Sequence, residues 1–193
     1  MTDDLDLASL IASRLCHDVV GPVGAIQNGL ELIAEDSAMA DMAMELIKKS
    51  AHQASAKLQF ARLAYGAAGG AETLDPGEAG KLTAAIFDGE RAELVWDISG
   101  DAKPRNAVKI AMLLAAFALG AVPRGGTVTV REGAVVAEGQ TVRTPPFSEI
   151  LEGGDEVADP RAAQALVIAR LVKAEGQTIE VTADEATVTF SLS

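Results

Sequence analysis

Cysteine and aromatic residues are scarce in this 193-residue chain. The single cysteine, Cys16, excludes an intrachain disulfide and cannot form a thiolate metal site by itself. We expect it to be a small buried apolar residue, which is the common state of a free cysteine. Aromatic residues make up 4% of the sequence, while alanine and glycine are abundant. This composition favours closely packed helices over a β-sandwich.

Positively charged tracts and long apolar runs are missing as well. The chain has a formal net charge of −12 and no lysine- or arginine-rich segment, which makes nucleic acid an unsuitable partner. The longest apolar stretch, residues 110–122, is too short to cross a bilayer. The N-terminus, M-T-D-D-L-D, lacks the basic and apolar regions of a signal peptide. We therefore expect a cytoplasmic protein that does not bind membranes.

Two long helices are predicted in the first third of the chain. Apolar residues recur at helical spacing from about Leu7 to Ala34, interrupted only by Gly21-Pro22. A turn follows, with Asp36 or Ser37 as the next N-cap, and a second helix runs to about Tyr65. Such an antiparallel hairpin is too long to bury its own apolar stripes. We expect a second copy to complete a four-helix bundle, in a homodimer with twofold symmetry.

The pattern changes after a cluster of helix-breaking residues, Gly66 to Gly70. We place a domain boundary here, with residues 1–68 as the hairpin domain and residues 72–193 as the second domain. The second domain alternates helices with mixed or antiparallel strands, which makes the whole chain an α+β fold ending in an α/β sandwich. The expected helices are 75–88, 104–119 and 159–175, and the expected strands are 93–98, 127–131, 135–137, 178–182 and 187–192, with a weaker strand at 141–143.

His17 is the residue with the most informative chemistry. An imidazole is partly neutral near pH 7 and can attack phosphorus as a nucleophile. The adjacent Asp18 can hold one ring N–H, which fixes the tautomer and leaves the other nitrogen free to react. Gly21, one turn further on, removes side-chain bulk, and Pro22 cannot donate to the carbonyl of Asp18, so the helix should bend there. A lone helical histidine is commonly an ordinary surface residue, which is our interpretation of His52.

The sequence around His17 resembles a known signalling motif. Residues 17–26, H-D-V-V-G-P-V-G-A-I, are similar to the H-box of dimerising sensor histidine kinases, with histidine, acid, proline and isoleucine in register. Segments 124–130, 169–181 and 187–192 resemble strands and a helix of the kinase ATP-binding domain. The resemblance implies a dimerising helical hairpin followed by a Bergerat-type ATP-binding fold.

The departures from the kinase pattern concern ATP. Kinases of this type carry Mg²⁺-binding asparagines on one helix, and the corresponding positions here are Leu113 and Phe117. The D-x-G-x-G signature is absent, and the glycine-rich phosphate loop is replaced by residues 161–166, R-A-A-Q-A-L. We therefore expect no ATP chemistry and no cofactor bound by this chain. Gly21 stands where kinases have threonine or asparagine, from which we expect poor phosphatase activity.

A further resemblance accounts for this combination. Segments 14–18 (R-L-C-H-D), 24–33 and 58–67 are similar to the ChpT-type histidine phosphotransferases of alphaproteobacteria. The resemblance implies a homodimeric phosphorelay carrier with no ATP-dependent kinase activity. Such a carrier would accept phosphate on His17 from the receiver domain of a hybrid histidine kinase and pass it to response regulators that control the cell cycle. The partner receiver would supply Mg²⁺.

Several residues are predicted to meet the docked receiver. Hairpin symmetry puts His17 level with residues 54–58, so Lys57, Gln59 and Arg62 are candidates on the second helix. Arg14, one turn before His17, is a candidate for steadying phosphate. Val20, Gly21 and Gly24 offer a small, partly apolar patch for a receiver helix. For each base, the alternative is a solvated surface residue.

Three other functions remain open at this stage. One is an active sensor kinase with unusual ATP motifs, which nucleotide binding would support. Another is a regulatory binding module of kinase-like fold in which His17 is inert. The third is an all-helical adaptor, against which the strand-rich region 120–193 argues.

Overall fold

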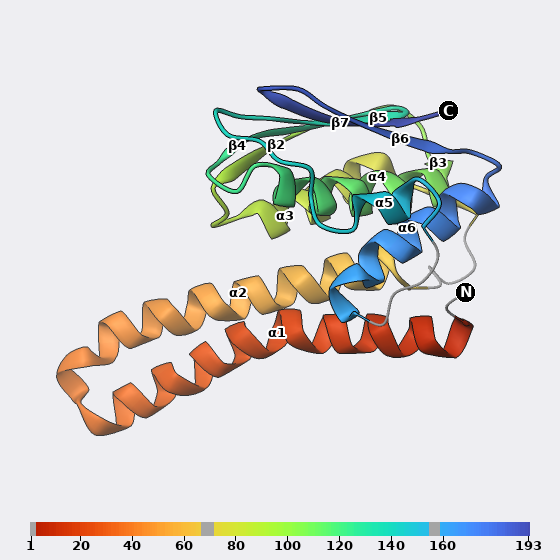
Figure 1. Ribbon diagram of the computed structural model, residues 1–193. Coiled ribbons are helices and arrows are strands. Elements are labelled where there is room, and N and C mark those ends of the chain that lie inside the picture. Colours follow the sequence, from red (N-terminus) through yellow and green to blue (C-terminus); the bar gives the residue numbers. More distant parts are fainter. Residues whose placement is uncertain (1–2, 67–71, 155–158) are drawn as a thin grey trace.

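The computed structural model describes residues 3–66, 72–154 and 159–193. Its first part is a long antiparallel hairpin of α1 (Asp4–Glu35) and α2 (Ala40–Ala64), joined through the 3₁₀ turn η1 (Ser37–Met39) (Figure 1). Asp36 Oδ1 accepts a hydrogen bond from the amide of Ala38 at 2.9 Å and so caps the 3₁₀ turn. The prediction of Asp36 or Ser37 as N-cap of the second helix is wrong, because α2 begins after Met39, which makes no side-chain capping bond. The two predicted helices are confirmed. Most of the predicted boundary cluster, residues 67–70, lies outside the described residues.

Helix α1 continues through Pro22 without ending. Figure 1 shows a change of direction between its N-terminal and C-terminal halves. A proline inside a helix removes one backbone hydrogen bond and crowds the preceding turn, which bends the axis. The bend expected after His17 is therefore present.

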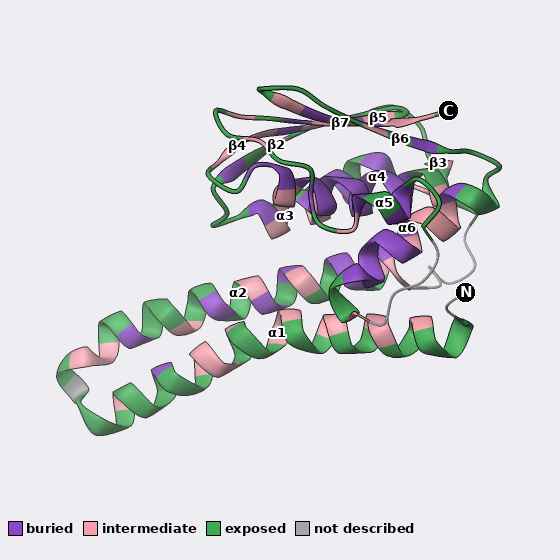
Figure 2. Ribbon diagram, in the orientation of Figure 1, coloured by how far each residue is buried: buried purple, intermediate pink, exposed green. Residues whose placement is uncertain are grey.

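The hairpin buries little of itself within one chain (Figure 2). Gly29 is the buried residue of α1, and near the far end of α2 only Ala43 is buried among the described side chains. Large apolar side chains remain exposed here, among them Leu30 at 57% and Met42 at 68%. The base of the hairpin is different, because Phe60 and Ala64 of α2 are part of the hydrophobic core of the following layer.

That layer is a mixed five-stranded sheet with helices on the face toward the hairpin (Figure 1). The strand order is β2-β4-β5-β7-β6, with β2 and β4 parallel and every other neighbouring pair antiparallel. The predicted α+β fold is confirmed, and the all-helical alternative is excluded. The elements are α3 (Pro76–Phe87), β2 (Ala92–Asp97), α4 (Arg105–Ala118), η3 (Leu119–Ala121), β4 (Gly126–Arg131), β5 (Ala134–Glu138), η4 (Pro160–Ala162), α6 (Ala163–Ala174), β6 (Ile179–Ala183) and β7 (Thr187–Leu192).

Helix α4 forms the centre of the core. Ile110, Met112, Leu113 and Leu114 are fully buried between the sheet and the remaining helices. Phe117, on the same helix, meets Phe190 of β7 edge to face, with ring centroids 5.9 Å apart. Because apolar residues cover almost the whole circumference of α4, the helix is enclosed rather than lying at the surface.

Three details differ from the sequence predictions. Segment 141–143 is not a strand, because β5 already pairs with β4 on one side and β7 on the other, and Arg143 donates its amide to Ala121 O at 3.0 Å instead. The short pair β1 (Thr73–Leu74) and β3 (Lys103–Pro104) and the single turn α5 (Ser148–Leu151) are additional elements. Helix 159–175 begins with the 3₁₀ turn η4, capped by the Asp159 side chain.

No helix within the described residues is both long enough and apolar enough to cross a bilayer.

Candidate functional site

His17 lies in the middle of α1 with its imidazole directed into solvent. Its side chain is 88% exposed, and its Nδ1 is 3.4 Å from Oδ1 of Asp18. Cys16 beside it is also exposed, so the expectation of a buried thiol is wrong. At this level the half-buried face of α1 consists of residues 14, 15, 18 and 19, and positions 16 and 17 point away from it. The imidazole is therefore accessible to a macromolecular partner.

Asp18 is held in place by two cationic side chains. Arg14, four residues earlier, donates from Nε to Oδ2 of Asp18 at 2.9 Å. Lys57 of α2 donates from Nζ to the main-chain carbonyl of Asp18 at 3.1 Å. The predicted alignment of His17 with residues 54–58 is thus observed. Because Oδ2 is occupied by Arg14, Oδ1 is the carboxylate oxygen turned toward the imidazole.

A groove of about 240 Å³ lies beside this cluster, between the base of the hairpin and the α/β layer. Arg14, Asp18 and Lys57 line one side of it, and Tyr65, Gln164 and other residues line the rest. Burial raises the pKa of Tyr65 to about 12, while the nearby Arg14 guanidinium opposes this rise and the Asp18 carboxylate adds to it. The phenol therefore stays protonated under physiological conditions.

The 3₁₀ turn η4 brings a second arginine near the site. The Arg161 carbonyl accepts a hydrogen bond from Nη1 of Arg14 at 3.4 Å. The Arg161 side chain pairs with Asp159, with Nη2 2.6 Å from Oδ2, and this pair holds the pKa of Asp159 below its usual range. Its guanidinium also lies over the Phe147 ring, 5.9 Å from the centroid.

Three residues of the groove and of η4 were not predicted from the sequence to belong to the site. Tyr65 is the sole tyrosine of the chain, and Arg161 and Gln164 are polar residues in the segment that replaces the kinase phosphate loop. Gln164 Nε2 donates to Leu113 O at 2.7 Å and is buried. Polar residues at the start of an apolar helix were the available signal, but sequence spacing could not show that they face the hairpin.

The predicted apolar patch is open. Val20 is 68% exposed, and a Cβ built at Gly21 or Gly24 would have no heavy atom within 4 Å beyond the helix's own backbone and neighbours. Gln59 and Arg62 are exposed on α2, and Gln59 donates to Ser55 Oγ at 2.9 Å. Neither residue lines the groove. Contact of these five residues with a partner therefore remains a prediction.

The two positions predicted from the sequence to correspond to the kinase asparagines are occupied by core residues. Leu113 is fully buried, and Phe117 is 9% exposed and packed on Phe190. Within residues 3–66, 72–154 and 159–193, no group of three or more His, Cys, Asp and Glu side chains is placed to hold a metal ion. The described residues thus offer no ready-made ligand set for a metal.

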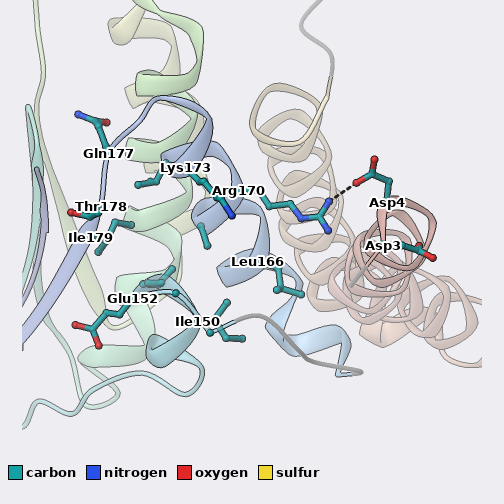
Figure 3. A pocket seen from close by; sticks show the side chains of 15 residues that line it. Asp3, Asp4, Ile150, Glu152, Leu166, Arg170, Lys173, Gln177, Thr178 and Ile179 are labelled. Carbon is teal, nitrogen blue, oxygen red and sulfur yellow. Dashed lines mark hydrogen bonds and ion pairs between the residues drawn. The ribbon is translucent and has the colours of Figure 1, made fainter. Parts of the chain in front are cut away.

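A larger cavity of about 660 Å³ lies between the N-terminal turn of α1 and α5, α6 and β6 (Figure 3). Its charged groups include internal contacts. Arg170 Nη1 donates to Asp4 Oδ1 at 2.5 Å (Figure 3). Glu152 Oε1 accepts from the Val181 amide at 3.1 Å. These contacts tie the first turn of α1 to α6, and the loop after α5 to β6.

The fold and the site together define a class of protein: a long helical hairpin that carries an exposed histidine beside an acid, followed by an α/β sandwich, as in histidine phosphotransferases of kinase-like fold. The sequence model of the family described as histidine phosphotransferase C-terminal domain matches residues 76–187. Protein phosphotransferase ChpT of Brucella abortus (strain 2308) is 40% identical over 199 aligned residues, covering 97% of this chain and 95% of that protein. The chain belongs to the ChpT-type histidine phosphotransferases, and its predicted role as a phosphorelay phosphotransferase is confirmed at this level.

A solved structure agrees with this assignment. A bacterial phosphotransferase determined at 1.7 Å is 34% identical, with a TM-score of 0.87 over 100% of this chain and 98% of that one. The histidine kinase domain of the blue-light activated kinase EL346 of Erythrobacter litoralis is more distant. It is 14% identical, with a TM-score of 0.46 over 89% of this chain and 92% of that one.

Proposed function

We propose that His17 is the phosphoacceptor of a cytoplasmic phosphorelay. It would take a phosphoryl group from the receiver aspartate of a hybrid histidine kinase and pass it to the receiver aspartates of response regulators. The observation that carries this proposal is the pairing of an 88% exposed imidazole with a carboxylate oxygen 3.4 Å from its Nδ1. His52 also has a carboxylate nearby, with its Nε2 3.7 Å from Oδ2 of Asp88, but Asp88 is 74% exposed. Asp18 is only 34% exposed and is held by Arg14 and Lys57.

The geometry supports a simple transfer step. Asp18 accepts the Nδ1–H, which leaves the lone pair on Nε2 free to attack phosphorus. As the Nε2–P bond forms, the bond from phosphorus to the receiver's carboxylate oxygen breaks, and the receiver aspartate leaves as a carboxylate. The Nδ1 proton stays on the ring, and the Asp18 charge stabilises the resulting cationic phosphoimidazole. Passage to the next receiver reverses these bonds.

The partner receiver would provide the metal ion, for which the described residues of this chain offer no ligand set. Phosphoryl transfer proceeds through a loose transition state, in which positioning and charge neutralisation dominate. The receiver would supply Mg²⁺ at its own aspartate, and Val20, Gly21 and Gly24 give a helix of the receiver room to approach His17. ATP has no part in the proposed step. The burial of Leu113 and Phe117 supports this, since kinase-type Mg²⁺ ligands would be needed at those positions.

The proposed working form is a homodimer. The exposed apolar residues of the hairpin, such as Leu30 and Met42, would pack against the same residues of a second copy and form a four-helix bundle. Most of the large apolar side chains that are exposed in the described residues lie on α1 and α2, and such a concentration is typical of an interaction surface. The bundle would leave each His17 near the α/β layer of the dimer.

Transfer from a pre-phosphorylated receiver domain tests the proposal. We expect radiolabel to move to the wild type and to His52→Ala but not to His17→Ala, and the bound phosphate to be acid-labile and base-stable. ATP alone should label none of them. Labelling of wild type by ATP would establish the unusual-kinase alternative, and absence of labelling from any cognate receiver would favour an inert binding module.

A further inference from the structure

The main-chain carbonyl of Asp18 lacks its usual hydrogen-bond donor within α1. In an α-helix this carbonyl accepts a hydrogen bond from the amide four residues on, which here is position 22. Position 22 is a proline and has no N–H, so the usual donor is missing beside the site. A partly buried carbonyl left without a donor destabilises the fold, and native structures usually supply another donor.

Lys57 is that donor. Its Nζ lies 3.1 Å from Asp18 O, across the hairpin and 39 residues along the chain. Its side chain lines the groove between the hairpin and the α/β layer. The Lys57 ammonium therefore lies against the main chain of α1. It occupies the place of the N–H donor that Pro22 lacks.

We propose that Lys57 is a positioning residue that replaces the backbone hydrogen bond removed by Pro22, and thereby fixes Asp18 and His17 for phosphoryl transfer. This rests on the proposed function of His17. It changes the role expected of Lys57, which was a contact with the docked receiver. Together with Arg14, which holds the Asp18 carboxylate at 2.9 Å, Lys57 fixes both the main chain and the side chain of that residue.

The contact of Lys57 lies at the level of the bend in α1. Pro22 frees a carbonyl one turn before the bend, and Lys57 uses it to join α2 to α1 at the level of the imidazole. A helix that is bent but unanchored would let the Asp18–His17 pair shift relative to the docked partner. Misplacement of a reacting group by about 1 Å can lower a transfer rate about 100-fold.

A double-mutant cycle on Lys57 and Pro22 tests the proposal. Pro22→Ala restores an amide to position 22, which can donate to Asp18 O and make the Lys57 contact redundant. In the native background we expect Lys57→Met to lower kcat for phosphate uptake about tenfold, with the KM for the phosphorylated receiver unchanged. In the Pro22→Ala background the same substitution should lower kcat by about twofold or less. Lys57→Arg should retain most of the native rate.

Equilibrium unfolding of the same four proteins gives a readout that does not depend on transfer. The cost of Lys57→Met to stability should be larger in the native background than in the Pro22→Ala background, because only the former leaves the carbonyl without a donor. Equal losses in both backgrounds, in either rate or stability, would overturn the proposal. A raised KM with unchanged kcat would also overturn it and assign Lys57 to receiver docking. Labelling of His17→Ala equal to that of wild type would instead remove the proposed function itself.

Discussion

Arg14 and Asp18 form an ion pair one helical turn apart, in which Oδ2 is bound by Nε and Oδ1 is left facing His17. We predict that Arg14→Gln will slow phosphate uptake about 2- to 10-fold, the equivalent of losing one hydrogen bond worth about 0.5–1.5 kcal/mol. Stability should change by less than about 1 kcal/mol, because the pair is partly exposed to solvent. Uptake kinetics measure the effect, with Arg124→Gln as a matched charge control. An unchanged rate for Arg14→Gln would show that Asp18 needs no such support.

The ionisation of the Tyr65 phenol can be followed without overlap from another tyrosine. It is the single tyrosine of the chain, so absorbance of the phenolate near 295 nm reports on this residue alone. Burial raises its pKa to about 12, and we expect the folded protein to titrate there rather than near 10. Since the phenol is held neutral in the folded state, its contribution to stability is complete below pH 10 and is lost between about pH 10 and 12.

Tyr65→Phe should abolish that part of the pH dependence. The free energy of unfolding of the wild type should fall by at most about 1.4 kcal/mol per pH unit from this group over the interval, and the variant should lack this term. Denaturant titrations at pH 9, 10 and 11 compare the two proteins. A phenolate midpoint near 10 in the folded protein would show that the phenol is in contact with water.

The glycines of α1 provide a pair of substitutions with opposite expected effects. At Gly29 an added Cβ would lie 2.6 Å from Cγ1 of Ile47 and 3.2 Å from the Ala43 carbonyl, so Gly29→Ala should destabilise the hairpin by about 1–3 kcal/mol. Gly24→Ala meets no such contact and has no proline neighbour, so it should stabilise the helix by about 0.5–1 kcal/mol. Thermal unfolding followed by circular dichroism compares them. Two substitutions of equal effect would contradict the close packing of α1 on α2 at Gly29.

Self-association can be tested on the exposed apolar side chains. Leu30→Glu places a charge on the hairpin surface that the proposed bundle would bury, so we expect sedimentation equilibrium to show monomers at concentrations where the wild type is dimeric. Val95→Glu, on the exposed face of β2, is the matched control and should leave the wild-type assembly intact. A wild type that sediments as a monomer at all concentrations would rule out the bundle.

The long elements could be predicted because their signals are local and repeated. The helices of the hairpin show apolar spacing over many turns, and Asp36, Asp75 and Asp159 act as caps in or beside the predicted turns. Shorter elements could not be predicted in this way. β1 and β3 have two residues each, and α5 has four, so none repeats a pattern. Segment 141–143 has strand-like residues, and only the order of the sheet shows that β5 has no free edge for it.

The functional site also contains residues whose positions could be predicted from the sequence and residues whose positions could not. His17 and Asp18 are adjacent in sequence, and hairpin symmetry brought Lys57 to the correct level. The contact of Arg14 with the Arg161 carbonyl spans 147 residues and depends on how the α/β layer sits on the hairpin, which no periodicity encodes. The sequence also did not indicate that Arg14 would be engaged with Asp18, or Lys57 with a carbonyl, where phosphate and receiver contacts were expected.

Helix α2 and the α/β layer share one hydrophobic core, and this limits where the chain can be truncated. The segment that matches the family model, residues 76–187, leaves out Phe60 and Ala64 and stops where β7 begins, although β7 lies between β5 and β6 in the sheet. The borders of the family match therefore differ from the borders of the hydrophobic core. We expect a truncated chain of residues 76–187 to fold poorly, because it would lose the Phe60 and Ala64 contacts and most of the strand between β5 and β6.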